Sequence, residues 1–219
     1  MLLDLVFPRR CIVCGGPAEA LCGACRMQLR RLGAPRCARC GAPTAWPVER
    51  CRECSGRRIA FASATAAVAY DDPARRVVAA WKEQGLRNLA VLAAELVAQS
   101  VPRPRAYTIS FVPADADRRL KRGHNPAERL ATELGARWEL PVVALLERAH
   151  GVRPQRGLPL SERRRNVRGV FSATGRAPAS LILVDDVYTS GATVSAAASA
   201  LRKAGARRVE VVTFARAVR

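Results

Sequence analysis

Two adjacent carboxylates, Asp185 and Asp186, follow the apolar run at residues 181–184 and precede a Thr-Ser-Gly-Ala-Thr turn at residues 189–193. The apolar run is typical of a buried parallel strand, and ligands of open α/β sheets bind at the carboxyl ends of such strands. The Ala-rich pattern at residues 192–204 predicts a helix, whose first backbone N–H groups would attract a phosphate. The carboxylates would repel phosphate but accept hydrogen bonds from sugar hydroxyls, so the pattern favours a sugar phosphate.

This segment resembles the PRPP-binding motif of type I phosphoribosyltransferases, enzymes that use 5-phosphoribosyl 1-pyrophosphate (PRPP). The resemblance implies that Asp185 and Asp186 bind the ribose hydroxyls. It implies that the 5′-phosphate is bound by the turn residues Thr189, Ser190, Gly191, Ala192 and Thr193. Thr189 stands where purine-salvage members carry an Asp, which argues against a purine acceptor. The alternative is a strand-turn-helix with a capping Ser or Thr, which does not require two adjacent acids.

All eight cysteines lie in the first 54 residues and form four Cys-x-x-Cys pairs. A gap of two residues lets both thiolates of a pair face one tetrahedral metal ion, and a structural zinc ion takes four such ligands. Such closed sites leave no open metal position, so they predict a structural or partner-contacting role. We expect two zinc sites paired in chain order, with a crossed pairing as the alternative: Cys11, Cys14, Cys22 and Cys25, then Cys37, Cys40, Cys51 and Cys54.

A disulfide framework is the other interpretation of these cysteines, and it requires an oxidising compartment. The apolar stretch at residues 1–7 is too short for the core of a signal peptide or for a membrane span. Metal ligation, a cytoplasmic location and no membrane insertion are therefore expected.

The rest of the chain alternates strand-like and helical patterns, which predicts an α/β fold with a parallel sheet flanked by helices. We expect a cysteine-rich module at residues 1–58 and an α/β domain at residues 59–219. The module has few apolar residues, so its folding should depend on metal. Strands are predicted at residues 64–70, 107–112, 142–146, 169–172, 181–187 and 209–215, and helices at 74–84, 89–99, 126–138 and 192–204.

Two basic loops are predicted to leave the same edge of the sheet as the acid pair. The first covers residues 115–124, and the second, residues 148–168, contains seven arginines. Arginine binds phosphate through paired N–H donors, which suits both loops to a polyphosphate. A solvated basic surface is the alternative for either loop.

Over nearly its full length the chain resembles the ComF family of competence-type, phosphoribosyltransferase-like proteins. The resemblance rests on Trp81-Lys82, Lys121 to Asn125, the Gln155, Glu162-Arg163 and Asn166 pattern, and the acid-pair motif. It implies Mg²⁺ bound with PRPP, transfer of a phosphoribosyl group to an unknown acceptor, and a link to DNA uptake. It implies catalytic roles for Asp185, Asp186, Arg118, Arg122 and Lys82, and a flexible loop with Arg153, Gln155, Arg163 and Asn166.

The net charge of +19, from 37 basic and 18 acidic residues, supports a different function. Affinity for a nucleic-acid backbone rises with the number of phosphates neutralised, so a non-catalytic protein that binds single-stranded DNA or DNA-uptake proteins is the second expectation. Steep salt dependence would distinguish such a binder from an enzyme that releases pyrophosphate. Its strand-tracking face would be formed by Arg26, Arg30, Arg31, Arg36 and Arg39.

Overall fold

The computed structural model describes residues 10–116, 120, 122–149 and 169–218. Its main sheet has four parallel strands in the order β1-β6-β5-β2. One row of paired residues, Ser63, Glu210, Ile182 and Ile109, crosses the whole sheet. The carboxyl ends of all four strands therefore lie at one edge. The strands are β1 (Ser63–Ala69), β2 (Ile109–Phe111), β5 (Ser180–Tyr188) and β6 (Arg208–Arg216).

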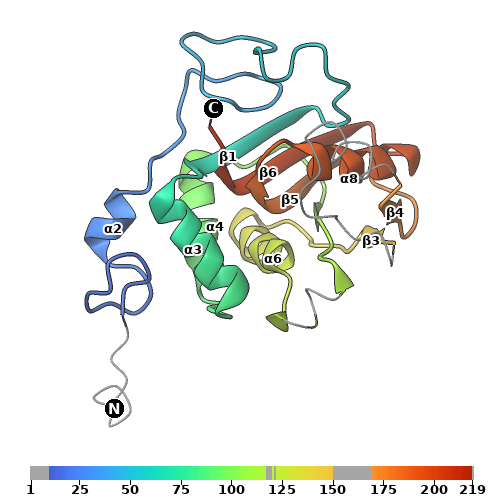
Figure 1. Cartoon of the computed structure of the whole chain (residues 1–219). Coiled ribbons are helices and arrows are strands. Elements are labelled where there is room, and N and C mark those ends of the chain that lie inside the picture. Colours follow the sequence, from blue (N-terminus) through green and yellow to red (C-terminus); the bar gives the residue numbers. More distant parts are fainter. Residues whose placement is uncertain (1–9, 117–119, 121, 150–168, 219) are drawn as a thin grey trace.

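Helices cover both faces of this sheet (Figure 1). Along β5, Ile182 and Val184 contribute to a core shared with α3, α4 and α6, whereas Leu181 and Leu183 contribute to a core shared with α8. This alternation follows from the two-residue period of a strand. The expected α/β class, a parallel sheet flanked by helices, is confirmed. The helices are α2 (Gly23–Met27), α3 (Asp72–Glu83), α4 (Leu89–Ser100), α6 (Pro126–Trp138) and α8 (Ala192–Lys203).

Two helices begin at caps that are visible in the sequence. Asp71 accepts a hydrogen bond from the N–H of Ala74 at the start of α3. Asn125 accepts one from the N–H of Ala127 at the start of α6. In both helices a proline follows in the first turn, where its missing N–H costs no hydrogen bond.

Two predicted strands, at residues 142–146 and 169–172, do not join the main sheet as regular strands. Residues 142–146 were expected to form a strand, but within them only Val142 pairs with the main sheet, through a single bridge to Ile109. The regular strand is β3 (Leu146–Arg148), which pairs antiparallel with β4 (Phe171–Ala173) in a separate two-stranded sheet. The apolar run at residues 142–146 indicated a buried segment but not the strand with which it pairs, because a short apolar run is compatible with several strand pairings.

The cysteine-rich segment lies along the free edge of β1. The N–H of Leu32 donates to the carbonyl of Ala67 at 2.9 Å, and the N–H of Ala69 donates to the carbonyl of Arg30 at 2.8 Å. Further along, the N–H of Ala64 donates to the carbonyl of Arg39 at 3.1 Å. These bonds satisfy backbone groups that an edge strand would otherwise leave unpaired. The division at residue 58 stays a prediction, and these contacts cross it.

In the ranges that the structure describes, every helix is too short or too polar to cross a lipid bilayer.

Candidate functional site

The acid pair lies at the carboxyl end of β5, beside a lysine from α3. Lys82 Nζ lies 2.7 Å from Asp186 Oδ1, and the Asp186 residue is only 8% exposed. The backbone N–H of Asp186 donates to Asp185 Oδ1 at 2.9 Å, which orients the first carboxylate. Lys82 and the two acids, far apart in sequence, therefore form one charged group at the ligand edge of the sheet.

Within this group, the Asp185 carboxyl is costly to ionise. Burial and the neighbouring Asp186 carboxylate raise the pKa of Asp185 to about 7, although Lys82 and Arg148 act in the opposite direction. A carboxylate that is costly to ionise is stabilised by any hydroxyl donor or cation that reaches it. Perturbed acids of this kind gather at functional sites.

The 189–193 turn connects β5 to α8 and brings backbone N–H groups close to the acids. Gly191 has a φ of +72°, and a Cβ there would lie 2.2 Å from the Tyr188 hydroxyl oxygen, so only glycine fits. The N–H of Ala192 donates to Ser190 Oγ at 3.3 Å. Helix α8 has no side-chain hydrogen bond at its N-cap. An N-terminus of this kind is suited to an anion.

Two further basic residues are held near this edge by acids. Arg122 Nη2 lies 2.5 Å from Glu83 Oε1, on the residue after Lys82. Arg148, at the end of β3, lies 3.8 Å from Asp115 and stacks over Phe171 at 5.5 Å. The other predicted residues of the two basic loops, Arg118, Arg153, Gln155, Arg163 and Asn166, lie outside the described residues.

His124 ties the first basic loop to α3. Its ring is 6% exposed, with Nδ1 2.9 Å from the Arg122 carbonyl oxygen and Nε2 3.0 Å from the Trp81 carbonyl oxygen. The neighbouring Asn125 side chain donates to the Val112 carbonyl at 3.1 Å and caps α6. These contacts fix the loop against the helix that carries Lys82.

The eight cysteines form two four-sulfur clusters, paired in the predicted chain order. In each cluster the sulfur atoms all lie within 4.8 Å of one another. We call Cys11, Cys14, Cys22 and Cys25 the first cluster, and Cys37, Cys40, Cys51 and Cys54 the second cluster.

The chemistry of both clusters fits zinc. The N–H of Cys51 donates to Cys37 Sγ at 3.3 Å, and the N–H of Cys22 donates to Cys11 Sγ at 3.4 Å. Burial raises the pKa of the Cys37 thiol, but backbone N–H donors outweigh burial and lower it to about 7. Four sulfurs, with a thiolate stabilised in this way, match the ligand set of a structural zinc site.

Most of the predicted strand-tracking face has a structural use. Arg26 bonds Glu95 of α4 at 2.6 Å, and Arg31 donates to the Leu96 carbonyl at 2.9 Å. Arg39 donates to the Ile59 carbonyl at 2.8 Å. These three guanidinium groups attach the cysteine-rich segment to the rest of the chain, so they are poorly placed to track DNA.

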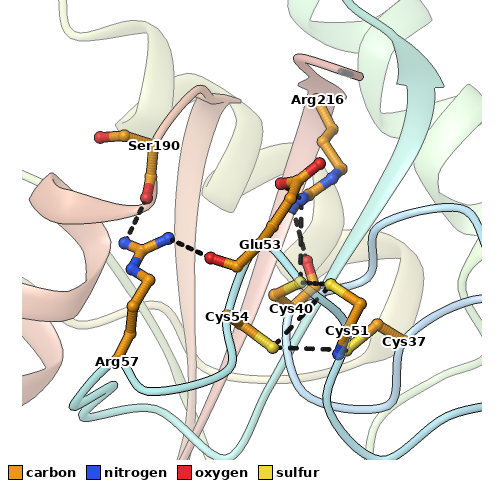
Figure 2. Close-up of polar contacts among 8 residues, drawn as sticks. All are labelled: Cys37, Cys40, Cys51, Glu53, Cys54, Arg57, Ser190 and Arg216. Carbon is orange, nitrogen blue, oxygen red and sulfur yellow. Dashed lines mark hydrogen bonds and ion pairs between the residues drawn. The ribbon is translucent and has the colours of Figure 1, made fainter.

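Four residues at the site were missed by sequence reasoning: Glu53, Arg57, Tyr188 and Arg216. Their contacts join the second cluster to the 189–193 turn, and Figure 2 shows those of Glu53, Arg57 and Arg216. Glu53 lies between two cysteines and Arg216 lies at the end of an apolar strand, so neither position indicated a role at the site from sequence alone. The 1% exposure of Arg216 is the feature that reveals its role.

The fold and the two clusters define the class: an α/β protein with a parallel sheet flanked by helices, preceded by a double zinc ribbon. The family model for the double zinc ribbon domain matches residues 2–55. Competence protein F of Haemophilus influenzae is 27% identical over 227 residues, covering 96% of this chain and 98% of that protein. Competence protein ComFC of Streptococcus pneumoniae is 25% identical, covering 90% and 88%. Similarity to these competence proteins over most of the chain supports the resemblance to the ComF family that its sequence predicted.

A weaker similarity is found to the solved structure of a larger protein. The glutamine PRPP amidotransferase from B. subtilis, complexed with ADP and GMP, is 21% identical with a TM-score of 0.39. The match covers 60% of this chain and 26% of that one.

Proposed function

We propose that this protein binds PRPP at the acid pair and the 189–193 turn, and transfers its phosphoribosyl group to an acceptor that is not a purine. The observation that carries the proposal is the group formed by Asp185, Asp186 and Lys82 beside the N-terminus of α8. It offers carboxylates that can accept hydrogen bonds from hydroxyls, a turn suited to an anion and a lysine ammonium group at one edge of the sheet.

Each group has a defined role in this proposal. Asp185 and Asp186 accept hydrogen bonds from the ribose hydroxyls, and the N–H groups of the turn hold the 5′-phosphate. The Lys82 ammonium group then leaves Asp186 and pairs with the pyrophosphate, to which Arg122 contributes a second positive charge. Breaking the bond between C1 and pyrophosphate builds positive charge on the sugar and negative charge on the leaving group, so catalysis rests on positioning and electrostatics.

Magnesium fits the same site. Its preferred ligands are carboxylate, phosphate and water oxygens, and the acid pair offers carboxylates. When bound with PRPP, Mg²⁺ would neutralise part of the pyrophosphate charge. Arg118 and the predicted flexible-loop residues Arg153 and Arg163 would add positive charge around the pyrophosphate.

Calorimetric titration of the zinc-loaded protein with PRPP and Mg²⁺ tests this proposal. The Asp185→Asn/Asp186→Asn double variant should lose binding, whereas Glu210→Gln, near the opposite edge, should keep it. Unchanged affinity in the double variant would refute the site. If the protein binds PRPP, release of pyrophosphate on addition of candidate acceptors tests the transfer reaction.

A second candidate function is binding of single-stranded DNA at the other edge of the sheet. The segments before β2, before β5 and before β6 lie together there, because the N–H of Arg207 donates to the Ala179 carbonyl and Ser180 Oγ donates to the Arg105 carbonyl. Tyr107, which is 73% exposed, adds an aromatic surface for stacking. The exposed basic residues of these segments are Arg103, Arg105, Arg176, Arg202, Lys203, Arg207 and Arg208.

The relatives named for competence are consistent with this candidate. Binding of a fluorescent oligonucleotide should weaken with salt, and each lost phosphate contact should reduce the slope of log K against log salt by about 1. We expect that reduction for Arg176→Ala and Arg207→Ala, but not for Arg50→Ala and Arg52→Ala on the second ribbon, the segment of residues 37–58 that carries the second cluster. Equal effects of all four variants would indicate nonspecific attraction to net charge.

A further inference from the structure

The second cluster lies against the 189–193 turn, whereas the first cluster lies elsewhere. Cys37, Cys40 and Cys54 are at most 1% exposed and belong to the core that also contains Tyr188 and Val194. The first cluster is held on the opposite side of the sheet, where Arg76 of α3 donates to the Val13 carbonyl at 3.1 Å. Figure 1 shows the corresponding segments on either side of β1.

Arg57 forms a direct link between the second ribbon and the turn. Its Nη2 donates to the Ser190 carbonyl at 2.6 Å, and its Nη1 donates to the Glu53 carbonyl at 3.3 Å (Figure 2). Glu53 directly precedes Cys54, so the Arg57 guanidinium bonds the backbone next to a predicted metal ligand. A charged donor makes the short bond to Ser190 stronger than an ordinary backbone bond.

This bond sets the orientation of a phosphate-binding group. A peptide unit is planar and trans, so its C=O and the following N–H point in opposite directions. With the Ser190 carbonyl directed at Arg57, the N–H of Gly191 points away from the ribbon. Beside it, the N–H of Ala60 donates to Ser195 Oγ on the first turn of α8 at 3.2 Å. Residues 57–60, which follow the second cluster in the chain, therefore hold both the turn and the start of the helix.

Arg216 forms a second, buried link. Its Nη1 donates to the Cys40 carbonyl at 2.6 Å, and its Nη2 lies 2.7 Å from Glu53 Oε2 and 3.8 Å from Cys40 Sγ. The same guanidinium stacks on the Tyr188 ring at 4.5 Å, and the Tyr188 hydroxyl occupies the space beside Gly191. A movement of Cys40 would therefore reach Gly191 through two buried side chains.

We infer that Arg57 and Arg216 are positioning residues through which the second cluster, and not the first, maintains the anion-binding conformation of the 189–193 turn. The two zinc sites then have different functions. The first stabilises attachment of the amino-terminal segment, whereas metal at the second is required for a formed phosphate site. The consequence for PRPP affinity rests on the function proposed above, but the conformational dependence does not.

Hydrogen exchange of the turn in the full-length, zinc-loaded protein tests this inference without any ligand. Arg57→Ala should speed amide exchange in a peptide covering residues 188–196 by about 10-fold or more, since a charged hydrogen bond is lost. The control Arg58→Ala removes an exposed neighbour with the same charge. Denaturation midpoints near that of the unsubstituted protein would show that the effect is local.

The metal dependence is tested by removing one ligand from each cluster. Cys51→Ser and Cys14→Ser should each reduce the zinc content from two ions to one. Only Cys51→Ser should speed exchange in the turn, and only that variant should weaken binding of inorganic phosphate. If Cys51→Ser fails to fold, Arg57→Ala, which leaves all eight ligands intact, still decides the question.

Unchanged exchange of the turn in Arg57→Ala, or equal acceleration in Cys14→Ser and Cys51→Ser, would overturn the inference. The proposed function fails separately, if the unsubstituted protein does not bind PRPP although its turn exchanges as expected. Parallel losses of turn protection and PRPP affinity in Arg57→Ala would support both.

Discussion

Replacing Asp185 by Asn should stabilise the fold while abolishing the proposed PRPP site. Burial and the Asp186 carboxylate raise the pKa of Asp185 from 3.8 to about 7, so ionising this group in the folded protein costs free energy. Asn removes the charge but keeps an oxygen that can accept the hydrogen bond from the N–H of Asp186. The variant should therefore keep the local geometry and lose the electrostatic cost.

The size of the gain follows from linkage between protonation and folding. A pKa difference of about 3 corresponds to at most about 4 kcal/mol once the pH exceeds the folded-state value. Asp185 keeps partial contact with solvent, which screens its charge, so we expect about 2 kcal/mol at pH 8. Because the folded-state pKa is raised, the cost is absent below pH 4, grows between pH 4 and 7, and is complete above that.

Urea denaturation of zinc-loaded protein at pH 5.5 and pH 8 measures this difference. The stabilisation of Asp185→Asn should be smaller at pH 5.5 than at pH 8, because part of the Asp185 population is protonated at the lower pH. Asp72→Asn, which changes an acid whose side chain is 80% exposed, should show no such increase with pH. A variant that is no more stable than the unsubstituted protein at pH 8, or a gain that does not depend on pH, would refute the reasoning.

Three further predictions use the same denaturation assay. Gly191→Ala should lower the free energy of unfolding by about 2–4 kcal/mol, because the new Cβ would meet both a positive φ and the Tyr188 side chain. Gly15 also has a positive φ but lies beside open space, so Gly15→Ala should cost about 1–2 kcal/mol. Equal costs would contradict the close approach. Lys82→Met should destabilise the fold by about 1–3 kcal/mol at pH 8, because Asp186 loses its charged partner. The loss should be smaller at pH 5.5, because Asp185 gains a proton there and repels Asp186 less. A loss that is larger at pH 5.5 would contradict this reasoning. Arg31→Ala should cost about 1–2 kcal/mol through its bonds to Leu96, Gln99 and Ser100, and Arg36→Ala should be nearly neutral; a neutral Arg31→Ala would contradict the attachment.

The elements that the sequence predicted well are those whose signals are local. The apolar run before Asp185 identified β5 because a central parallel strand is buried on both faces. Asn125-Pro126 identified the start of α6 because capping depends on neighbouring residues. The pairing of cysteines in chain order was predicted for the same reason, since short connections keep the ligands of one ion together.

The features that the sequence did not reveal depend on contacts between distant residues. Arg57 and Ser190 are 133 positions apart, and Arg216 and Cys40 are 176 apart. Arginines are abundant in this chain, so composition could not distinguish these two from solvated ones. The same ambiguity affected Arg26, Arg31 and Arg39, which were assigned to a DNA-binding face and in the structure bond Glu95, Leu96 and Ile59, respectively.

The pairing of residues 30–32 with β1 has a consequence for how the protein can be divided. In a chain started at residue 59, β1 would present unpaired N–H and C=O groups at Ala67 and Ala69 to solvent. Such an edge accepts a strand from another molecule, so the truncated protein would be prone to self-association. The amino-terminal segment therefore also covers an edge of the sheet, and laboratory work on the α/β part should retain it.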